Sequence, residues 1–406
     1  MTNSIWFDSK GREARTEDSP VKEFDVAIIG GGILGVSCAY FLSKRKNLKV
    51  ALIEQKCLAY GSSGRNAGFV LRGIETYYNQ CIDKYGREKA KYVYAFAEES
   101  QAVLRRFVDE CKIDFEYDPC GSYVLADSIE ELEDLEKSYE LLRQDGFGVE
   151  LIKADPTDRG FYGALLNGGD FGIHPVKLVR ALAQFSKVEL LENEPVQRIE
   201  TQRSSQKTLI HTNNEKILAG KTLIATNAYT PYLEPWFGPK LQVARAQMLS
   251  TYPLKNEILD RVCYANYGWI YFRQLKDKRL LLGGKRNTQL QEEVGLADIV
   301  TAPIQIALEE YLTDRFPEAA GVGIQYRWSG SMAFTSDGLP LLGKLPQHPE
   351  VYFAVGCNGH GMGYSTNMAQ QLVALALDGK EPSVFCANRS SLKNSNSTLC
   401  DDVDGP

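Results

Sequence analysis

Residues 24–56 read FDVAIIGGGILGVSCAYFLSKRKNLKVALIEQK, and this stretch decides the class of fold. Two short apolar segments, at about residues 25–30 and 49–54, have the length and the branched side chains of buried strands. The segment between them has the small and apolar residues of a helix, and Cys38 within it is expected to be a buried small hydrophobe. A strand, a helix and a second strand in this order predict a βαβ unit with a parallel sheet.

The apolar spacing predicts further helices at about residues 87–111 and 303–315. Another helix is expected to begin at Ser128, where Ser-Ile-Glu-Glu predicts a capping box between Ser128 and Glu131. Pro175 suits the first turn of a helix, because its missing N–H group has no partner there.

Glycines mark the turn from the first strand into the helix. Gly30 permits a tight turn, Gly32 allows the backbone to approach a pyrophosphate, and Gly35 lets the helix pack closely on the strand. The N–H groups and the dipole of the helix N-terminus then favour a phosphate at this point. Glu54 closes the second strand, where its carboxylate can accept a hydrogen bond from a ribose hydroxyl and disfavours the 2′-phosphate of NADP. The unit therefore predicts a dinucleotide site, for NAD or for FAD.

Two further Gly-rich segments favour FAD over NAD. The run GSSGRNAGFV at residues 61–70 has small and hydroxyl residues that can line a long flat ligand, and it also fits a flexible surface loop. The run GCNGHGMG at residues 356–363 leads into the last predicted helix. The N-terminus of that helix would stabilise the negative charge of a reduced flavin at its N1 and C2-oxygen edge, which a nicotinamide does not need. His360 is either a turn residue bonded to the backbone or an acid or base.

The order of these motifs resembles a known family. Besides the fingerprint and the two Gly-rich runs, the chain has Ile173-His174-Pro175, LIATNAY at 223–229 and SGSMAFTSDGLPLLG at 329–343. This order is similar to that of D-amino-acid oxidase, glycine oxidase and sarcosine oxidase relatives. The SGRNAG and NGHGM variants look most like the γ-glutamylputrescine oxidase type, and the resemblance spans about residues 24–380.

The resemblance implies an α/β fold with an α+β second domain. The first is a Rossmann-like FAD-binding domain of the glutathione-reductase type, and the second is a substrate domain with a mixed sheet. The implied FAD-binding domain is discontinuous, over residues 24–80, 155–235 and 325–385, and the substrate domain covers 81–154 and 236–324. Residues 1–23 are expected to form a polar leader, and the Ser- and Asn-rich residues 386–406 a disordered tail.

The residues expected to bind FAD lie in the Gly-rich segments and in short stretches that the resemblance adds. Those expected at the ADP half are Gly30, Gly32, Ile33, Leu34, Gly35, Glu54, Gln55 and Val196, whose backbone is expected to meet the adenine. Those expected at the flavin half are Ser62, Ser63, Arg65, Asn66, Ala67, Gly68, Thr226, Asn227, Gly330, Asn358, Gly359, His360, Gly361 and Met362. No metal site is expected.

The chain departs from the family pattern on the substrate side. Amino-acid-specific members carry an Arg followed by Pro that binds the substrate carboxylate, whereas Met332-Ala333 stands at that place here. The departure favours an amine, an N-substituted amine or an amino acid held in another way. Monomeric sarcosine oxidases attach their flavin through a Cys in the same stretch, where Gly330-Ser331-Met332 has none, so FAD is expected to be bound non-covalently. Cys357 is expected only to line the flavin turn.

The candidates for the substrate pocket are Tyr267, Tyr271, Met332 and His360. With Trp269, the two tyrosines would share one face of a strand, either as an aromatic wall around a substrate cation or as ordinary sheet core. Arg245 and Arg273 are candidate contacts for an anion, or strand charges that are solvated or ion-paired. No nucleophilic Ser, His or Cys is expected, because the flavin supplies the difficult chemistry.

The composition excludes several classes of partner. A chain of 406 residues, 44% apolar, can bury a large core. A net charge of -6 without a long basic block argues against nucleic acid. The sequence has no uncharged apolar run of about 18 residues and begins with a polar segment, so we expect a cytosolic protein without a membrane span. Nine Cys without a CxxC motif predict neither a disulfide framework nor a zinc site.

These observations lead to three hypotheses. In the first, the protein is an FAD-dependent oxidase of a small amine or amino acid: hydride passes to flavin N5, the imine hydrolyses, and oxygen as acceptor gives hydrogen peroxide. In the second, it is a dehydrogenase that passes the electrons to a quinone or a carrier. In the third, it is a flavin domain that acts within an assembly or on a modified macromolecule such as tRNA, against which the acidic balance argues.

Overall fold

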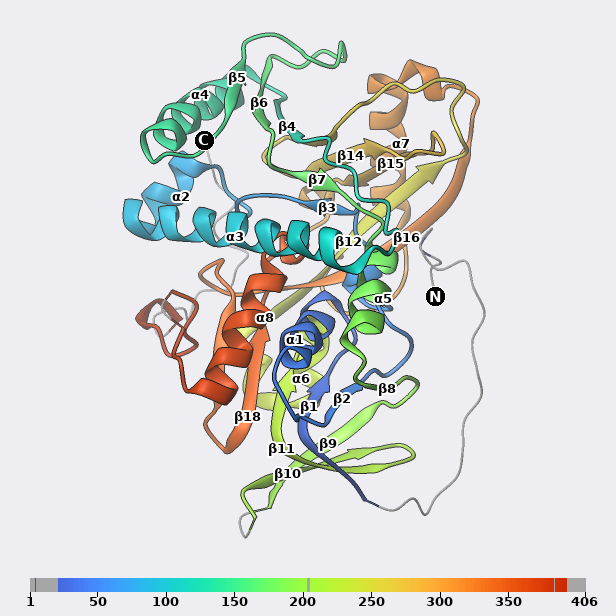
Figure 1. The fold of residues 1–406 in the computed structure, drawn as a ribbon. Helices are drawn as coiled ribbons and strands as arrows, with labels where there is room; N and C mark the ends of the chain where they lie inside the picture. Colours follow the sequence, from blue (N-terminus) through green and yellow to red (C-terminus); the bar gives the residue numbers. More distant parts are fainter. Residues whose placement is uncertain (1–3, 5–20, 203–204, 383, 393–406) are drawn as a thin grey trace.

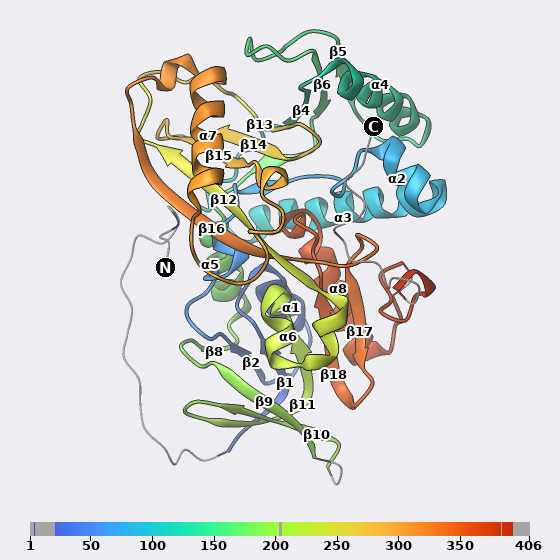
Figure 2. The same ribbon diagram turned by 180° about the vertical axis from the view of Figure 1, so that it is seen from behind.

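The computed structural model describes residue 4 and residues 21–202, 205–382 and 384–392. Over these residues the chain forms two large sheets and one short two-stranded sheet. The first large sheet lies in the lower half of Figure 1 and the second in its upper half, and Figure 2 shows the same two layers from behind. Both large sheets are mixed, which confirms the predicted class of an α/β fold with a second, mixed-sheet part.

The predicted βαβ unit is present at the centre of the first sheet. It consists of β1 (Lys22–Ile29), α1 (Ile33–Ser43) and β2 (Val50–Ile53), and β1 and β2 are parallel. Nine of the eleven residues of α1 are buried, because the helix packs on α5 and α8 as well as on the sheet. A helix that is apolar all round is typical of such an enclosed position. Cys38 is fully buried, as predicted.

The first sheet has the strand order β17-β18-β11-β1-β2-β8, and β9 and β10 extend it from β11. The further bounds are β8 (Glu189–Leu191), β9 (Val196–Gln202), β10 (Lys207–Thr212), β11 (Lys216–Ile224), β17 (Leu341–Leu345) and β18 (His348–Val355). Strands β18, β11, β1, β2 and β8 are parallel to one another. Their carboxyl ends therefore meet at one edge of the sheet, where ligands of open α/β folds bind.

The second sheet has the strand order β16-β12-β15-β14-β13-β4-β6-β5. Its strands are β4 (Ser122–Ala126), β5 (Glu150–Ile152), β6 (Gly163–Asn167), β12 (Gln242–Thr251), β13 (Val262–Ala265), β14 (Ile270–Gln274), β15 (Leu280–Gly284) and β16 (Ile324–Phe334). Its ladders are antiparallel except for the pair β4 and β13. The short sheet pairs β3 (Phe69–Val70) with β7 (Phe171–Gly172) between the two layers.

The helices lie close to their predicted positions. Beyond α1 they are α2 (Tyr78–Tyr85), α3 (Arg87–Cys111), α4 (Ile129–Gln144), α5 (Pro175–Ser186), α6 (Thr230–Leu233), α7 (Ala302–Arg315) and α8 (Gly361–Asp378). Figure 1 shows α1, α5 and α8 on one face of the first sheet and α3 crossing above them. Pro175 occupies the first turn of α5, as predicted for a residue without an N–H group.

The predicted capping box at the start of α4 is only half present. The Ser128 hydroxyl accepts a hydrogen bond from the Glu131 N–H group at 3.1 Å. The Glu131 carboxylate does not return to Ser128 but accepts from the N–H groups of Asp127 at 2.7 Å and Tyr267 at 2.6 Å. Glu131 thus joins α4 to the turn between β13 and β14, a tertiary contact that the local motif could not predict.

Strand pairing divides the chain differently from the predicted domain boundaries. β6 falls in segment 155–235, predicted for the FAD-binding domain, and pairs with β4 and β5 in the second sheet. β16 falls largely in segment 325–385 and pairs with β12 in the second sheet. Both strands lie next to FAD-side motifs in the sequence, but the strands with which they pair belong to the predicted substrate domain. The predicted domain boundaries therefore do not follow the two sheets.

The predicted disordered tail is wrong for residues 386–392. The Ala387 N–H group donates to the Leu342 carbonyl at 3.0 Å. Arg389 binds Asp337 through two parallel hydrogen bonds, Nε to Oδ2 at 2.6 Å and Nη2 to Oδ1 at 2.7 Å, and the two side chains are only 9% and 10% exposed. This fork gives the Ser- and Asn-rich segment an anchor that its composition did not reveal. Residues 393–406, and all of the predicted leader except Ser4 and residues 21–23, lie outside the described residues.

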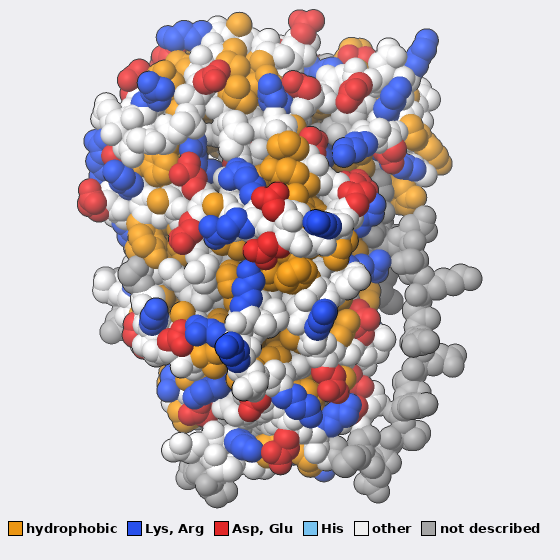
Figure 3. Space-filling view, in the orientation of Figure 1, with side chains coloured by type: hydrophobic (Ala, Val, Ile, Leu, Met, Phe, Trp, Pro, Cys, Tyr) orange, Lys and Arg blue, Asp and Glu red, His pale blue; other side chains and the backbone are white. Residues whose placement is uncertain are grey.

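The described residues bear on two expectations, that the chain has no membrane span and, on the face in Figure 3, no basic stripe. No helix of the described residues is long and apolar enough to cross a membrane. On the face in Figure 3, Lys and Arg side chains alternate with Asp and Glu over all the elements in view. The cytosolic location stays a prediction.

Candidate active site

One cavity of about 990 Å³ opens at the carboxyl edge of the first sheet and extends to the second sheet. Its size is at the upper end of the range of about 300–1,000 Å³ that is common for ligand sites. All but two of the predicted cofactor residues line it, and so do all four predicted pocket residues, Tyr267, Tyr271, Met332 and His360. Residues of both Gly-rich strand-to-helix junctions, one near each end of the chain, line the cavity, as predicted.

The β1–α1 junction depends on glycine at two points. Gly30 has a φ of +111°, and a Cβ atom there would lie 2.7 Å from the Ala225 carbonyl oxygen. A Cβ atom on Gly35 would lie 1.8 Å from the Gly30 carbonyl oxygen, so Gly35 serves the predicted close packing of helix on strand. Gly35 stands behind the junction and does not line the cavity, unlike Gly30, Gly32, Ile33 and Leu34.

Glu54 lies beside this junction at the end of β2. Its Oε2 accepts a hydrogen bond from the Gly31 N–H group at 2.7 Å and its Oε1 one from the Lys56 N–H group at 2.9 Å. Burial raises the pKa of the Glu54 carboxyl, and the two hydrogen bonds oppose that shift. Gln55 and Val196 line the cavity next to it, together with residues 194, 195 and 197.

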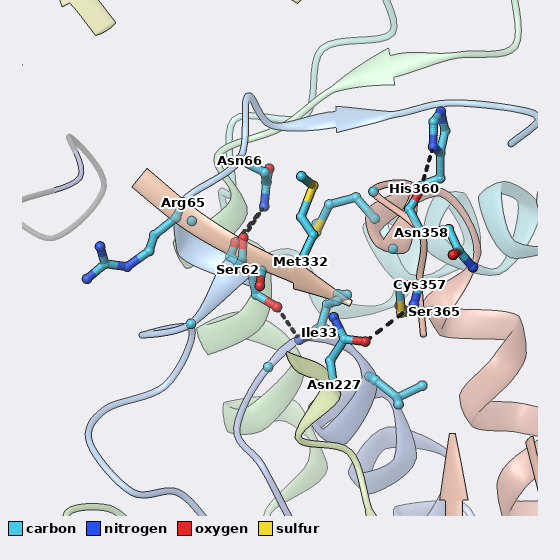
Figure 4. Close-up of a pocket in the computed structure, with 18 of the residues that line it drawn as sticks. Ile33, Ser62, Arg65, Asn66, Asn227, Met332, Cys357, Asn358, His360 and Ser365 are labelled. Atoms are coloured by element: carbon cyan, nitrogen blue, oxygen red, sulfur yellow. Dashed lines mark hydrogen bonds between the residues drawn. The ribbon is translucent and has the colours of Figure 1, made fainter. Parts of the chain in front are cut away.

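The segment 61–68 is an ordered loop held by its own polar groups. Ser63 Oγ accepts from the Ile33 N–H group at 2.9 Å, which joins the loop to the first turn of α1 (Figure 4). The Asn66 side chain donates to the carbonyl groups of Ser62 and Ser63 at 3.0 and 2.9 Å. Ser62 Oγ donates to the Ser331 carbonyl of β16. These bonds leave Ser62, Ser63, Asn66 and Ala67 on the wall of the cavity.

Two residues of this loop that are predicted to bind FAD have side chains or backbone groups that hold the loop itself. The Arg65 side chain points away from the other labelled residues in Figure 4 and binds Asp298 Oδ1 at 2.8 Å and the Ser329 carbonyl at 3.1 Å. Gly68 does not line the cavity. It has a φ of +77°, and its carbonyl accepts from the Ile173 N–H group at 2.8 Å. The family motif therefore includes residues that hold the loop as well as residues that face a ligand.

The second junction, from β18 to α8, is tied to the end of β11. Asn227 Oδ1 accepts hydrogen bonds from the N–H groups of Gly356 at 2.9 Å and Cys357 at 3.3 Å. The side chain of Asn358 accepts from the Thr335 N–H group at 2.9 Å. Thr226 and Asn227 line the cavity with Asn358, Gly359, Gly361 and Met362. Three chain segments thus place the α8 N-terminus at the cavity.

His360 and Cys357 are neutral groups at this junction. The His360 ring nitrogen Nδ1 lies 3.3 Å from the Asn358 carbonyl oxygen, and burial lowers the pKa of the ring. Burial raises the pKa of the Cys357 thiol to about 11, and its sulfur lies 3.8 Å from Ser365 Oγ. A thiol rather than a thiolate therefore faces the cavity at pH 7.

The aromatic wall is present, but not on one strand. Only Tyr271 lies in β14, whereas Tyr267 belongs to the turn between β13 and β14 and Trp269 follows that turn. The prediction of one strand face is wrong because Asn266, Tyr267 and Gly268 have φ values of 50°, 50° and 81°, which reverse the chain. The three aromatic residues nevertheless line the cavity, with Met332 and Gly330 of β16 across from them.

Arg245 and Arg273 are structural residues outside the cavity. Arg245 Nε binds the buried Glu293 carboxylate at 3.2 Å. Arg273 donates to the carbonyl groups of Gly68 and Ile173 at 3.1 and 3.2 Å and lies 3.7 Å from Asp118. For both arginines, the predicted alternative of an ion-paired strand charge is therefore confirmed.

Sequence reasoning missed several residues on the cavity wall. Among them are two with opposite charges, Glu75 in the loop before α2 and Arg286 directly after β15, and the aromatic residues Tyr264 and Phe334. The Gly283-Gly284 pair that ends β15 was the available signal for Arg286, because a Gly pair at a strand end often precedes a turn at a ligand. Glu75 has no such signal in its neighbourhood.

Comparisons with known proteins identify the family of this chain. The FAD-dependent oxidoreductase family, DAO, matches residues 25–375. Gamma-glutamylputrescine oxidoreductase from Escherichia coli (strain K12) is 25% identical over 370 residues, which cover 87% of this chain and 84% of that protein. Glycine oxidase from Bacillus licheniformis is 26% identical over 362 residues, covering 82% and 88%. The crystal structure of glycine oxidase from Geobacillus kaustophilus has a TM-score of 0.75 at 23% identity, covering 89% of this chain and 96% of that one. The chain therefore belongs to the DAO family of FAD-dependent oxidoreductases.

Proposed function

We propose that this protein is an FAD-dependent oxidase that acts on the C–N bond of a small amine or amino acid. The observation that carries the proposal is the meeting of two helix N-termini, those of α1 and α8, at one long cavity beside Glu54. One N-terminus suits the diphosphate of a dinucleotide and the other the electron-rich edge of a reduced flavin. The names of the relatives, gamma-glutamylputrescine oxidoreductase and glycine oxidase, support an amine or amino-acid substrate.

The residues present fit FAD. A Cβ atom on Gly32 would meet Ser63 Oγ at 2.9 Å, so the bare backbone of the α1 N-terminus faces the cavity and leaves room for a diphosphate. Glu54 can accept hydrogen bonds from a ribose, and the 194–197 segment encloses the same end. The loop 62–67 and the turn 358–362 border the other end. FAD, when bound there, supplies the acceptor for a hydride from the substrate carbon.

The chain's own groups at the flavin end are suited to holding a neutral amine. Tyr264, Tyr267, Trp269 and Tyr271 form an aromatic wall, and Met332 projects between the Ser62 loop and the Asn358 turn (Figure 4). His360 carries no charge at pH 7 because burial lowers its pKa. Such a wall excludes water and orients the C–H bond, which is all that hydride transfer requires of the protein.

We also propose that FAD is not covalently attached. The stretch Gly330-Ser331-Met332 of β16 has no Cys, and Cys357 is the cysteine on the cavity wall among the described residues. Its raised pKa keeps it a thiol, which is a poor nucleophile. Acid precipitation should release all the flavin from the protein, and yellow colour that stays with the precipitate would contradict this proposal.

An anaerobic screen tests the proposed function. The purified yellow protein is mixed with amines, N-methyl amino acids and D- and L-amino acids, and the visible flavin band is followed. Bleaching by at least one class of amine supports the function, and a band that none of them bleaches contradicts it. A bleached sample is then opened to air. Rapid return of the colour with one peroxide per flavin supports an oxidase, whereas slow return that only a quinone accelerates supports the dehydrogenase hypothesis.

A further inference from the structure

Arg286 is the one cation of the cavity wall whose guanidinium is stacked on aromatic residues there. It begins the short 3-10 helix Arg286–Thr288 after β15. Its guanidinium carbon lies 5.0 Å from the ring centroid of Trp269 and 4.8 Å from that of Phe334, and all three residues line the cavity. Two aromatic rings thus lie within cation–π distance of the guanidinium group, and neither can accept its N–H groups as a carboxylate would.

No hydrogen-bond acceptor serves this guanidinium among the residues that the structure describes. Other arginines nearby have acceptors: Arg65 binds Asp298, Arg245 binds Glu293, and the Arg273 Nη1 group binds two carbonyl groups. Arg286 has five N–H donors and no partner of this kind. Burial lowers the Arg286 pKa, although the group stays protonated at any ordinary pH, so the protein bears the cost of a poorly solvated charge there.

Two acidic residues, Glu75 and Glu293, interact electrostatically with Arg286, but neither forms an ion pair with it among the described residues. Glu293 is paired with Arg245, and the Glu75 carboxylate lies 3.6 Å from Lys84 Nζ. The two cavity charges therefore face a ligand separately instead of forming an ion pair. A site of this kind suits a ligand that brings its own anion to Arg286.

Position argues that this anion belongs to the substrate and not to FAD. Tyr271 and Phe334 belong to strands of the second sheet and Trp269 directly precedes β14, whereas the Gly-rich junctions belong to the first sheet. Phe334 lies two residues beyond Met332, the position where amino-acid-specific family members would have their Arg. Arg286, which follows β15, thus brings to the same cavity the positive charge that Met332 does not carry.

We propose that Arg286 binds a carboxylate of the substrate, so that the enzyme oxidises an amino acid or an N-substituted amino acid rather than an unsubstituted alkylamine. This inference rests on the proposed function and specifies its substrate. The planar fork of Arg fits two carboxylate oxygens, whereas an alkylamine would leave these half-buried donors unpaired.

A matched pair of ligands tests the proposal on the holoenzyme. Anthranilate carries an amine and a carboxylate on one ring, and aniline is the same molecule without the carboxylate. Each is titrated into the FAD-loaded protein, and the shift of the visible flavin band gives the Kd. We expect Arg286→Met to weaken anthranilate binding about 10- to 100-fold and to leave aniline binding unchanged, and Arg286→Lys to be intermediate.

Lys285→Met is the control that removes a positive charge next to Arg286 in the sequence without changing the cavity wall. Lys285 is the neighbouring residue, its Nζ lies 5.1 Å from the ring centroid of Tyr311, and it is not part of the cavity wall. This variant should bind anthranilate as the wild type does. Flavin content and thermal unfolding show whether each variant is folded and loaded.

Three results would overturn the proposal: equal anthranilate affinity in the wild type and Arg286→Met, no anthranilate-dependent band shift in the wild type, or loss of FAD from Arg286→Met. The last result would assign the guanidinium to the cofactor. Failure of the proposed function looks different, because a protein that binds anthranilate through Arg286 but is bleached by no amine or amino acid would keep the anion site and lose the oxidase assignment.

Discussion

Gly32 and Glu54 carry the dinucleotide assignment at the scale of single residues. Both line the cavity at the point where β1 turns into α1. Gly32 must be small so that the backbone can approach a phosphate, and Glu54 must accept hydrogen bonds so that it can hold a ribose. Each requirement can be broken by a single substitution with little effect on the rest of the fold.

Replacing Gly32 with Val should give colourless protein. The added side chain would begin 2.9 Å from Ser63 Oγ and occupy the place that we assign to the diphosphate. Flavin content per protein is read from the absorption spectrum. Gly148→Val is the matched control, because no atom lies within 4 Å of a Cβ there, and it should stay yellow. A Gly32→Val protein with a full complement of flavin would disprove the assignment.

Replacing Glu54 with Gln should weaken FAD binding about tenfold, the effect of about 1.4 kcal/mol from one charged hydrogen bond. The amide can still accept from the Gly31 N–H group, so the fold is kept. Titration of the apoprotein with FAD, followed by quenching of flavin fluorescence, measures the Kd. Glu192→Gln removes a nearby carboxylate that binds the Leu58 N–H group outside the cavity, and it should bind FAD normally. Equal Kd values for the two variants would contradict the role of Glu54.

Helix N-termini are the elements on which the site depends. The first turns of α1 and α8 face the cavity, and α5 supports the first of them from behind. At the start of α5, His174 Nδ1 accepts a hydrogen bond from the Lys177 N–H group at 3.3 Å. Burial lowers the pKa of His174 to about 4, and a protonated ring could no longer accept this bond.

This cap predicts a specific pH dependence of stability. The unfolded chain binds a proton at His174 near the ordinary histidine pKa of 6.5, whereas the folded chain does so only near about 4. Acidification through this range therefore favours the unfolded state, by at most about 3 kcal/mol. His174→Asn keeps an acceptor at the cap and cannot titrate. Urea unfolding at pH 7 and pH 4.5 should show a smaller loss of stability in this variant, and an equal loss would contradict the assignment.

At the scale of the whole molecule, segments far apart in sequence close the cavity. The Arg389–Asp337 fork attaches residues 386–392 to the turn between β16 and β17. Arg389 also lowers the pKa of Asp337, opposing the effect of burial. The same turn lies close to Glu75, because a Cβ on Gly338 would meet Glu75 Oε1 at 2.5 Å.

Arg389→Met should lower the free energy of unfolding by about 3 kcal/mol, because it leaves the Asp337 carboxylate buried without its partner. Urea denaturation of the FAD-loaded protein measures the change. Arg45→Met is the control, since the Arg45–Asp378 pair at 2.6 Å is exposed and should contribute less than about 1 kcal/mol. Similar losses in the two variants would show that the terminal segment is not anchored as described.

The sequence by itself determined the local parts of this protein. The glycines at 30–35, the apolar pattern of β1 and β2, and Pro175 act through contacts with near neighbours in the chain, so their spacing was enough to predict the βαβ unit, the phosphate-facing turn and the start of α5. The Gly-rich run at 356–363 before a predicted helix gave the second junction in the same way, and the resemblance added the short stretches between the two junctions.

Only the tertiary structure decided which long-range partners meet. Glu131 left its predicted cap for Asp127 and Tyr267, β6 and β16 joined the second sheet, and Arg389 found Asp337 across 52 residues. Glu75 reached the cavity from a loop with no motif, and Arg286 from a short 3-10 helix that only the preceding Gly pair marked. Such pairings depend on distance in space, on burial and on competition between partners, and none of these can be read from spacing along the chain.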